Sequence, residues 1–143
     1  MLRSKIAGMG FYVPERIVTN NDLARLFTTS DEWIQQRTGI KERRYVEDNV
    51  GVADLSLLAA ERALKDAGLN KEDVDYIILA SLSPDYCFPG SACLLHDLLG
   101  IDPIPALDIR TQCTGFIYAL SIADTYIRTG AYKNILVIGA EVH

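Results

Sequence analysis

The sequence predicts an α/β fold with a mainly parallel, mixed sheet covered by helices. Two stretches, residues 74–82 and 134–141, are continuous apolar runs of the kind that form strands buried on both faces. Between and before them, residues 53–68 and 115–129 carry apolar side chains at the spacing of one helix face. Strands that alternate with amphipathic helices are typical of parallel β-α-β units, so we expect the order βαβαβαβ.

The first third of the chain is expected to hold two short helices between extended pieces. We predict a strand over residues 5–14 that ends at Pro14, and a short extended piece over 43–46. A helix over 19–27 begins with Asn or Thr as its cap. A second helix spans 29–39, with Thr29 and Glu32 in capping-box spacing and Gly39 as its stop.

The remaining elements follow with short connections. The helix over 53–68 ends at Gly68, and the strand over 74–82 leads through a loop to a helix over 91–99. A strand over 105–109 precedes the helix over 115–129, which Gly130 ends, and the apolar strand over 134–141 closes the sequence. A sheet that stopped there would keep a bare edge and an uncovered face, so we expect these residues to be part of something longer.

Composition excludes several classes of function. Of the 143 residues, 49% are hydrophobic and 23% charged, the profile of an ordinary globular protein of about one domain. The net charge of −5 and the lack of a basic stripe argue against a nucleic-acid partner. No apolar run reaches membrane-spanning length and no signal peptide is evident, so we expect a cytoplasmic protein without a membrane partner.

The three cysteines do not suggest a disulfide framework or a metal centre. An odd number of cysteines without a secretory signal favours a reactive or a buried thiol. Cys87, Cys93 and His96 read C-x5-C-x2-H, a spacing that matches no familiar zinc pattern and has no evident fourth ligand. We therefore expect no metal site.

Cys113 stands where a strand passes into a helix. Residues 110–115 break the strand pattern, and apolar side chains recur at helical spacing from Phe116 to Ile127. Free N–H groups and the helix dipole at such a corner stabilise a thiolate, and the same N–H groups can hold an oxyanion. A small, buried, unreactive cysteine would fit the same position, so position alone leaves both interpretations open.

Three segments together resemble β-ketoacyl-acyl carrier protein synthase III, a condensing enzyme of the thiolase superfamily. They are TSDEWIQQRTGIKERR from residue 29, FPGSACLLHDLLG from residue 88 and DIRTQCTGFIYALSIAD from residue 108. The resemblance runs from Lys5 to the last residues, and its first segment is highly specific. It implies a thiolase-like fold, with residues 1–143 forming the N-terminal half-domain that carries the nucleophile and the C-terminal half absent from this chain.

The resemblance also implies a reaction that begins fatty-acid synthesis. An acyl group, from acetyl-CoA or a similar primer, passes to an active-site cysteine and then condenses with malonyl-acyl carrier protein as carbon dioxide leaves. Cys113 matches the nucleophile, Thr29, Trp33 and Arg37 match coenzyme A contacts, and Phe88 matches a residue that lines the partner's acyl pocket across a homodimer. Coenzyme A thioester is then a substrate, and no permanently bound cofactor is implied.

For Trp33 and Arg37 the residues themselves point the same way. Four positions apart on a helix, an indole and a guanidinium share a face and can sandwich an adenine. A tryptophan that anchors a core or interface, or a pair that stacks only on itself, is the other interpretation. For Thr29 a helix-cap role alone would account for the residue, and a loop phenylalanine such as Phe88 is often a packing plug.

The sequence departs from the family pattern around the nucleophile. Arg110, Thr111 and Gln112 precede Cys113 where small residues, typically alanines, are usual. The family's catalytic His and Asn and its Gly-rich loop belong to the second half of the fold, and neither His96 nor His143 matches them. We therefore expect the chain alone to be incomplete for condensation. The alternatives are a related secondary-metabolite ketosynthase and a non-catalytic CoA-binding fragment.

Overall fold

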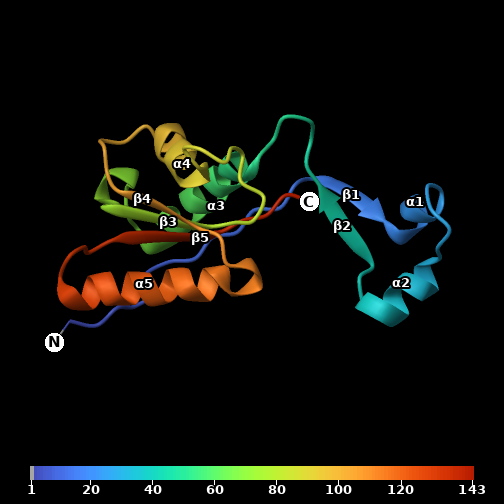
Figure 1. The fold of residues 1–143 in the computed structure, drawn as a ribbon, viewed down its shortest axis with the longest axis horizontal. Helices are drawn as coiled ribbons and strands as arrows, with labels where there is room; N and C mark the ends of the chain where they lie inside the picture. The colour runs from blue at the N-terminus through green and yellow to red at the C-terminus, as the bar shows by residue number, and fades with distance from the viewer. Residues whose placement is uncertain (1) are drawn as a thin grey trace. The chain divides into compact units, whose positions relative to one another are not determined.

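The computed structural model describes residues 2–143, which divide into two compact units. Unit 1 comprises the described residues up to Tyr12 together with Gly51–His143, and unit 2 comprises Val13–Val50. Each unit is described by itself below. Unit 1 contains the larger sheet and three long helices, whereas unit 2 contains a two-stranded ribbon and two short helices (Figure 1).

The sheet of unit 1 is parallel and has β3 at its centre. β3 (Tyr76–Ala80) pairs with β4 (Ala106–Ile109) on one side and with β5 (Ile135–Gly139) on the other, in the order β4-β3-β5. All five residues of β3 are buried. A strand covered on both faces has to be apolar throughout, which explains the continuous apolar run of the sequence and confirms the predicted parallel α/β arrangement.

Helices cover both faces of this sheet. α3 (Val52–Ala67) and α4 (Ser91–Leu99) lie on one face, and α5 (Gly115–Thr129) lies on the other (Figure 1). Side chains alternate along a strand, so Ile77 and Leu79 of β3 pack in the core beneath α3 and α4, while Ile78 and Ala80 pack beneath α5. The predicted helices over 53–68, 91–99 and 115–129 are confirmed to within a residue.

Carboxylates at strand and loop positions hold the starts of two helices. Asp85 accepts a hydrogen bond from the Ala53 N–H in the first turn of α3, at 3.1 Å. Asp108, in β4, accepts one from the Ala92 N–H in the first turn of α4, also at 3.1 Å. A negative charge beside the unpaired amides of a first turn stabilises a helix, and here it also ties each helix to a segment distant in sequence.

The strand predicted over residues 5–14 is wrong. The segment is extended but pairs with no strand, and β1 begins only at Arg16. Its backbone bonds instead to side chains of α3: the Met9 N–H donates to Asp66 at 2.9 Å, and the Phe11 carbonyl accepts from Arg62 at 2.8 Å. A Cβ on Gly8 would lie 2.4 Å from the Ala67 backbone nitrogen, so glycine permits the close approach to α3.

Unit 2 is built on an antiparallel ribbon. β1 (Arg16–Thr19) pairs with β2 (Glu42–Tyr45), and between them lie α1 (Asn20–Ala24) and α2 (Asp31–Thr38). Thr19 caps α1 as the sequence suggests, and Gly39 ends α2 with a φ of 73°. The capping role predicted for Thr29 is wrong, because the Ser30 hydroxyl accepts from the Trp33 N–H at 3.1 Å and thus caps α2.

Within the part of the chain that the structure describes, no helix is both long and apolar enough to cross a membrane.

Candidate active site

Cys113 lies in a short 3₁₀ turn, Gln112–Thr114, that joins the end of β4 to the start of α5. Its side chain is exposed. No side chain caps the start of α5, so the first amides of this helix have no side-chain acceptor of that kind. The structure thus places the thiol at the strand-to-helix corner that the sequence predicts, open to solvent rather than buried.

The corner is tightly bent and packs closely on the sheet. Gln112 has a φ of 50°, in the left-handed region that a non-glycine residue adopts rarely. A Cβ on Gly115 would lie 3.1 Å from the Cβ of Ala80, so α5 begins almost in contact with the end of β3. Cys113 therefore follows the carboxyl end of β4 and sits beside the carboxyl end of β3, the edge where open α/β sheets bind ligands.

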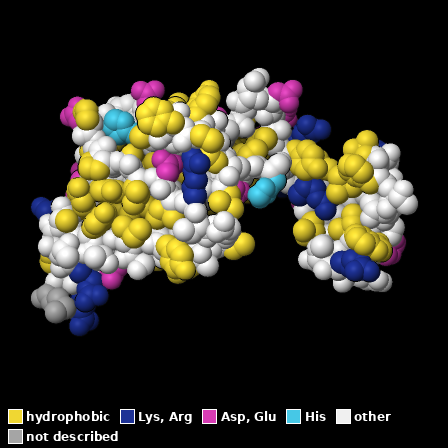
Figure 2. Space-filling view, in the orientation of Figure 1, with side chains coloured by type: hydrophobic (Ala, Val, Ile, Leu, Met, Phe, Trp, Pro, Cys, Tyr) yellow, Lys and Arg dark blue, Asp and Glu magenta, His cyan; other side chains and the backbone are white. Residues whose placement is uncertain are grey.

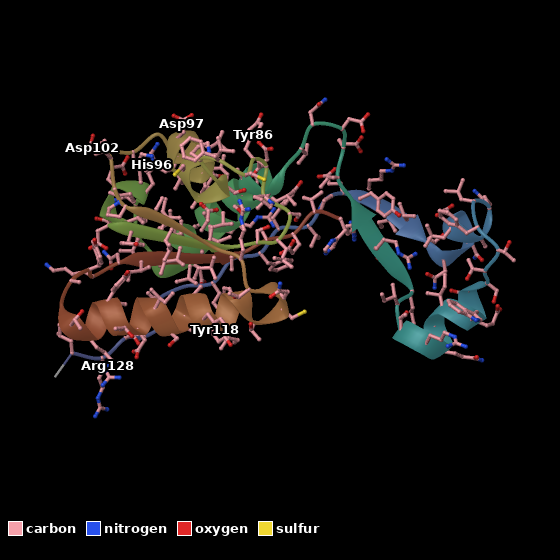
Figure 3. All side chains as sticks on the ribbon, in the orientation of Figure 1. Tyr86, His96, Asp97, Asp102, Tyr118 and Arg128 are labelled. Carbon is pink, nitrogen blue, oxygen red and sulfur yellow. The ribbon has the colours of Figure 1, made fainter. Side chains whose placement is uncertain are left out.

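The loop between β3 and α4, residues 81–90, carries Phe88 beside this edge of the sheet. Phe88 is 90% exposed, and Tyr86 from the same loop also projects from it (Figure 3). With this exposure Phe88 does not fill a gap in the packing of unit 1, as a loop phenylalanine often does. The Phe88 side chain is therefore accessible for contact with groups outside unit 1.

The same loop is held firmly despite its exposed aromatic side chains. Glu141, just after β5, accepts hydrogen bonds from the Leu82 N–H at 2.7 Å and from the Ser83 hydroxyl at 2.6 Å. Burial acts to raise the pKa of Glu141, but these hydrogen bonds outweigh it and hold the pKa below its ordinary value. Arg110 donates to the Cys87 carbonyl at 3.3 Å, which links the loop to the corner that contains Cys113.

In unit 2, α2 presents Trp33 and Arg37 together. The guanidinium carbon of Arg37 lies 4.7 Å from the centroid of the Trp33 ring, in cation–π contact, and the indole is 53% exposed. Their four-residue spacing therefore produces the shared face that the sequence predicts. The Thr29 hydroxyl is buried and makes no hydrogen bond in the structure.

Sequence reasoning missed the residue that organises unit 2. The sequence indicates only a possible helix cap at Asn20, yet this residue is 1% exposed and its side-chain amide makes three hydrogen bonds within the unit. Its sequence signal is weak, because an Asn beside a Thr at a helix start looks like a cap. In the sequence Arg110 is visible only as a departure from the family pattern, and nothing there indicates its contact with the loop.

The cysteine and histidine residues weighed for a metal site are not gathered into one. Cys87 is exposed, Cys93 is half-buried, and the Nε2 of His96 lies 3.1 Å from the Asp102 carbonyl oxygen (Figure 3). Over residues 2–143 the structure has no group of three or more His, Cys, Asp or Glu side chains able to hold a metal ion.

Comparison with known proteins places these features in one family. The family model described as 3-oxoacyl-[acyl-carrier-protein (ACP)] synthase III matches residues 107–143, the segment that contains Cys113. A relative named β-ketoacyl-[acyl-carrier-protein] synthase III 1, from Vibrio vulnificus, is 52% identical over 138 residues, which cover 96% of this chain and 44% of the relative.

Solved structures agree with the sequence relatives. The crystal structure of 3-oxoacyl-[acyl-carrier-protein] synthase III from Aquifex aeolicus is 49% identical, with a TM-score of 0.91 over 96% of this chain and 44% of that chain. The priming β-ketosynthase of the R1128 polyketide pathway is 30% identical, with a TM-score of 0.92 over 98% of this chain and 42% of that one.

These matches confirm the thiolase-like fold class, and the chain spans less than half the length of the relatives it matches. Its fold and its sequence, including the segment around Cys113, agree with the same relatives. Over 96% of its length the chain is similar to members of the β-ketoacyl-acyl carrier protein synthase III family.

Proposed function

We propose that this chain supplies the acyl-accepting part of a β-ketoacyl-acyl carrier protein synthase III, with Cys113 as the nucleophile. The observation that carries the proposal is the exposed thiol in the turn that opens α5, at the carboxyl edge of the parallel sheet. In the reaction the Cys113 sulfur attacks the thioester carbonyl of acyl-CoA. A new carbon–sulfur bond forms to Cys113, the bond to the coenzyme A sulfur breaks, and the proton of the Cys113 thiol ends on released coenzyme A.

Trp33 and Arg37 are proposed to bind the adenine of coenzyme A. The supporting observation is an exposed indole that already stacks with a guanidinium 4.7 Å from its centroid. One face of the indole is then in contact with a cation, and a purine can stack on the pair without displacing a core contact. Thr29, two residues before α2 begins, is proposed to contribute to the same site.

The complete reaction is proposed to be decarboxylative condensation of the acyl group with malonyl-acyl carrier protein at the start of fatty-acid synthesis. The groups that activate the malonyl thioester are proposed to come from outside residues 1–143. Of the two histidines present, His96 lies on α4 and contacts the Asp102 backbone carbonyl, and His143 lies beyond β5. The length of the relatives, more than twice that of this chain, supports the same assignment.

Exposed apolar side chains on unit 1 support packing of further polypeptide. Ile6, Met9 and Phe11 of the extended segment are 70–75% exposed, and Ile117 of α5 is also largely exposed. Figure 2 shows hydrophobic side chains gathered over β5 on the face in view. Apolar surface in such quantity is typical of interfaces. Phe88 is proposed to cross a homodimer interface and to line the acyl pocket of a second copy.

A second candidate is priming of a secondary-metabolite pathway. It is favoured by the 30% identity to the priming ketosynthase of a polyketide pathway and by Arg110, Thr111 and Gln112 before the nucleophile. The chemistry at Cys113 would be the same, so the primer distinguishes the two. Preference for acetyl-CoA supports the fatty-acid role, whereas preference for a longer or branched acyl-CoA supports the alternative.

The experiment is incubation of the chain with radiolabelled acetyl-CoA, followed by mass mapping of the labelled peptide. We expect a hydroxylamine-sensitive label on Cys113 that is absent from Cys113→Ala and retained in Cys87→Ala, the control that removes another exposed thiol. Binding of coenzyme A without any label on Cys113 would indicate the non-catalytic binder instead. With malonyl-acyl carrier protein added, condensation by the chain unaided would refute the assignment of the missing groups to other polypeptide.

A further inference from the structure

Unit 2 contains a buried polar network centred on Asn20. The Nδ2 of Asn20 donates to the Asp31 carboxylate at 2.7 Å and to the Ile40 carbonyl at 2.7 Å. Its Oδ1 accepts from the guanidinium of Arg43, also at 2.7 Å. The amide thus uses both donors and its acceptor at short distances while only 1% exposed. A fully satisfied buried amide of this kind fixes its neighbours in one arrangement.

The contacts of Asn20 bracket one helix. Asp31 is the first residue of α2, and Ile40 follows Gly39, the residue that ends it. One side chain therefore binds the chain both where α2 begins and directly after it ends. Arg43 extends the network to the ribbon, since it also donates to the Val18 carbonyl of β1 at 3.2 Å. The position of α2 on the ribbon is set through these groups.

α2 needs such support because it is short and buries little. It has eight residues, and of these Ile34 alone is buried. Helices of this length are unstable on their own in water, and one apolar anchor contributes little packing. The Ser30 cap and the hydrogen bond from Gln35 to Asp31, at 2.6 Å, act within the helix and its first turn. They do not fix where α2 lies relative to the rest of unit 2.

We infer that Asn20 is the positioning residue for the proposed coenzyme A helix: it holds α2 at both ends so that the Trp33–Arg37 pair is ready to receive the adenine. The inference rests on the proposed role of that pair. Asn20 itself is buried and acts through Asp31 and Ile40 rather than on the ligand. A preformed site saves the free energy of ordering α2 during binding.

The decisive variant is Asn20→Asp, which keeps the size of the side chain and the acceptor for Arg43. It removes the donors to Asp31 and Ile40 and places two carboxylates together. The rescue variant combines Asn20→Asp with Asp31→Asn, so that an amide and a carboxylate again meet with donor and acceptor exchanged. The matched control is Asn134→Ala in unit 1, which removes an amide hydrogen bond to the Asp73 carbonyl of 2.9 Å.

Two readouts separate the inference from the proposed function. The first needs no ligand and consists of two measurements. One is amide hydrogen exchange in α2, especially of the Gly39 N–H, which donates to the Gln35 carbonyl. The other is fluorescence emission of Trp33, the single tryptophan of the chain. The second is the Kd for coenzyme A, from quenching of Trp33. If α2 is ordered in about one tenth of the molecules, the apparent Kd rises roughly tenfold.

We expect Asn20→Asp to speed exchange in α2 at least tenfold and to weaken coenzyme A binding about tenfold. The double variant should recover much of both, and Asn134→Ala should change neither. Unchanged α2 exchange in Asn20→Asp overturns the inference whether or not coenzyme A binds. Equal acceleration throughout β1 and β2 also overturns it, since Asn20 would then stabilise the whole unit. Failure of the unaltered chain to bind coenzyme A refutes the proposed ligand, and the ligand-free readout still decides the role of Asn20.

Discussion

Replacing Gly8 by alanine tests how the extended N-terminal segment lies on α3. The added Cβ would lie 2.4 Å from the Ala67 backbone nitrogen and 2.6 Å from the Ala63 carbonyl oxygen. Ordinary contacts begin near 3.4 Å, so the segment must move away from the helix by about 1 Å. Both neighbours are backbone atoms of α3 and cannot turn aside as a flexible side chain could. The shift would lengthen the 2.9 Å hydrogen bond from the Met9 N–H to Asp66 beyond useful range.

Two opposing effects set the size of the loss. Alanine restricts the unfolded chain and stabilises by roughly 0.4–1 kcal/mol. Overpacking and a lost hydrogen bond to a charged group cost more, about 1–3 kcal/mol each. The net destabilisation should therefore be about 1–5 kcal/mol, which lowers Tm by roughly 2–20 °C in a protein of this size.

The assay is thermal unfolding followed by circular dichroism, together with exchange of the Met9 amide. The matched control is Met9→Ala, which changes the same segment at a side chain that is 72% exposed, and which should leave Tm within about 1 °C. If Gly8→Ala also left Tm and the Met9 amide unchanged, the close seating of this segment on α3 would be wrong.

Three further predictions follow from burial and hydrogen bonding. Leu95→Ala, at a side chain with no exposed area, should destabilise by about 2–5 kcal/mol in a denaturant titration, whereas Leu98→Ala, at a residue 44% exposed, should cost much less. Burial raises the pKa of Tyr76 to about 12. The unfolded chain therefore loses this proton at a lower pH than the folded chain does, and stability should fall as pH rises from about 10 towards 12. Unfolding curves of Tyr76→Phe should show a smaller decline over the same range. Hydrogen bonds, from Asn20 first, hold the pKa of Asp31 below its ordinary value, so the contribution of ionised Asp31 to stability is present above about pH 4 and is lost as pH falls further. Trp33 emission should therefore change below that pH, and should change less in Asp31→Asn. An equal change in the two proteins would contradict the assignment of this pH dependence to Asp31.

The sequence predicted the sheet and the long helices of unit 1 well, because the pattern of apolar residues in each element follows directly from which of its faces are buried. A strand such as β3, buried on both faces, has to be apolar throughout, and α3 and α5 need one apolar face. The segment over residues 5–14 has the same apolar character, yet its Ile6 and Phe11 are exposed and it pairs with no strand. Pairing depends on what lies beside a segment, which local pattern does not record.

The candidate site likewise has some features that the sequence predicts and others that it does not. The corner at Cys113 and the shared face of Trp33 and Arg37 follow from helix geometry, and the sequence therefore located them. The cap lies at Ser30, one residue after the predicted Thr29, because Ser and Thr are both favoured in that role and stand side by side. The network of Asn20 joins residues up to 23 positions apart, and a single sequence gives no signal for such a contact.

The central place of β3 has a consequence for how the molecule is made. Tyr76 is aligned with Ile135, 59 positions later, and Ile77 with Ala106, 29 positions later. Contacts that close such long loops form slowly and carry a large entropic cost. A nascent chain that has emerged only as far as α5 has one neighbour for β3 and leaves the other edge of an entirely apolar strand open. Productive folding on the ribosome therefore depends on the arrival of Ile135–Gly139, and any pause in translation before it prolongs the interval in which this strand is vulnerable to aggregation.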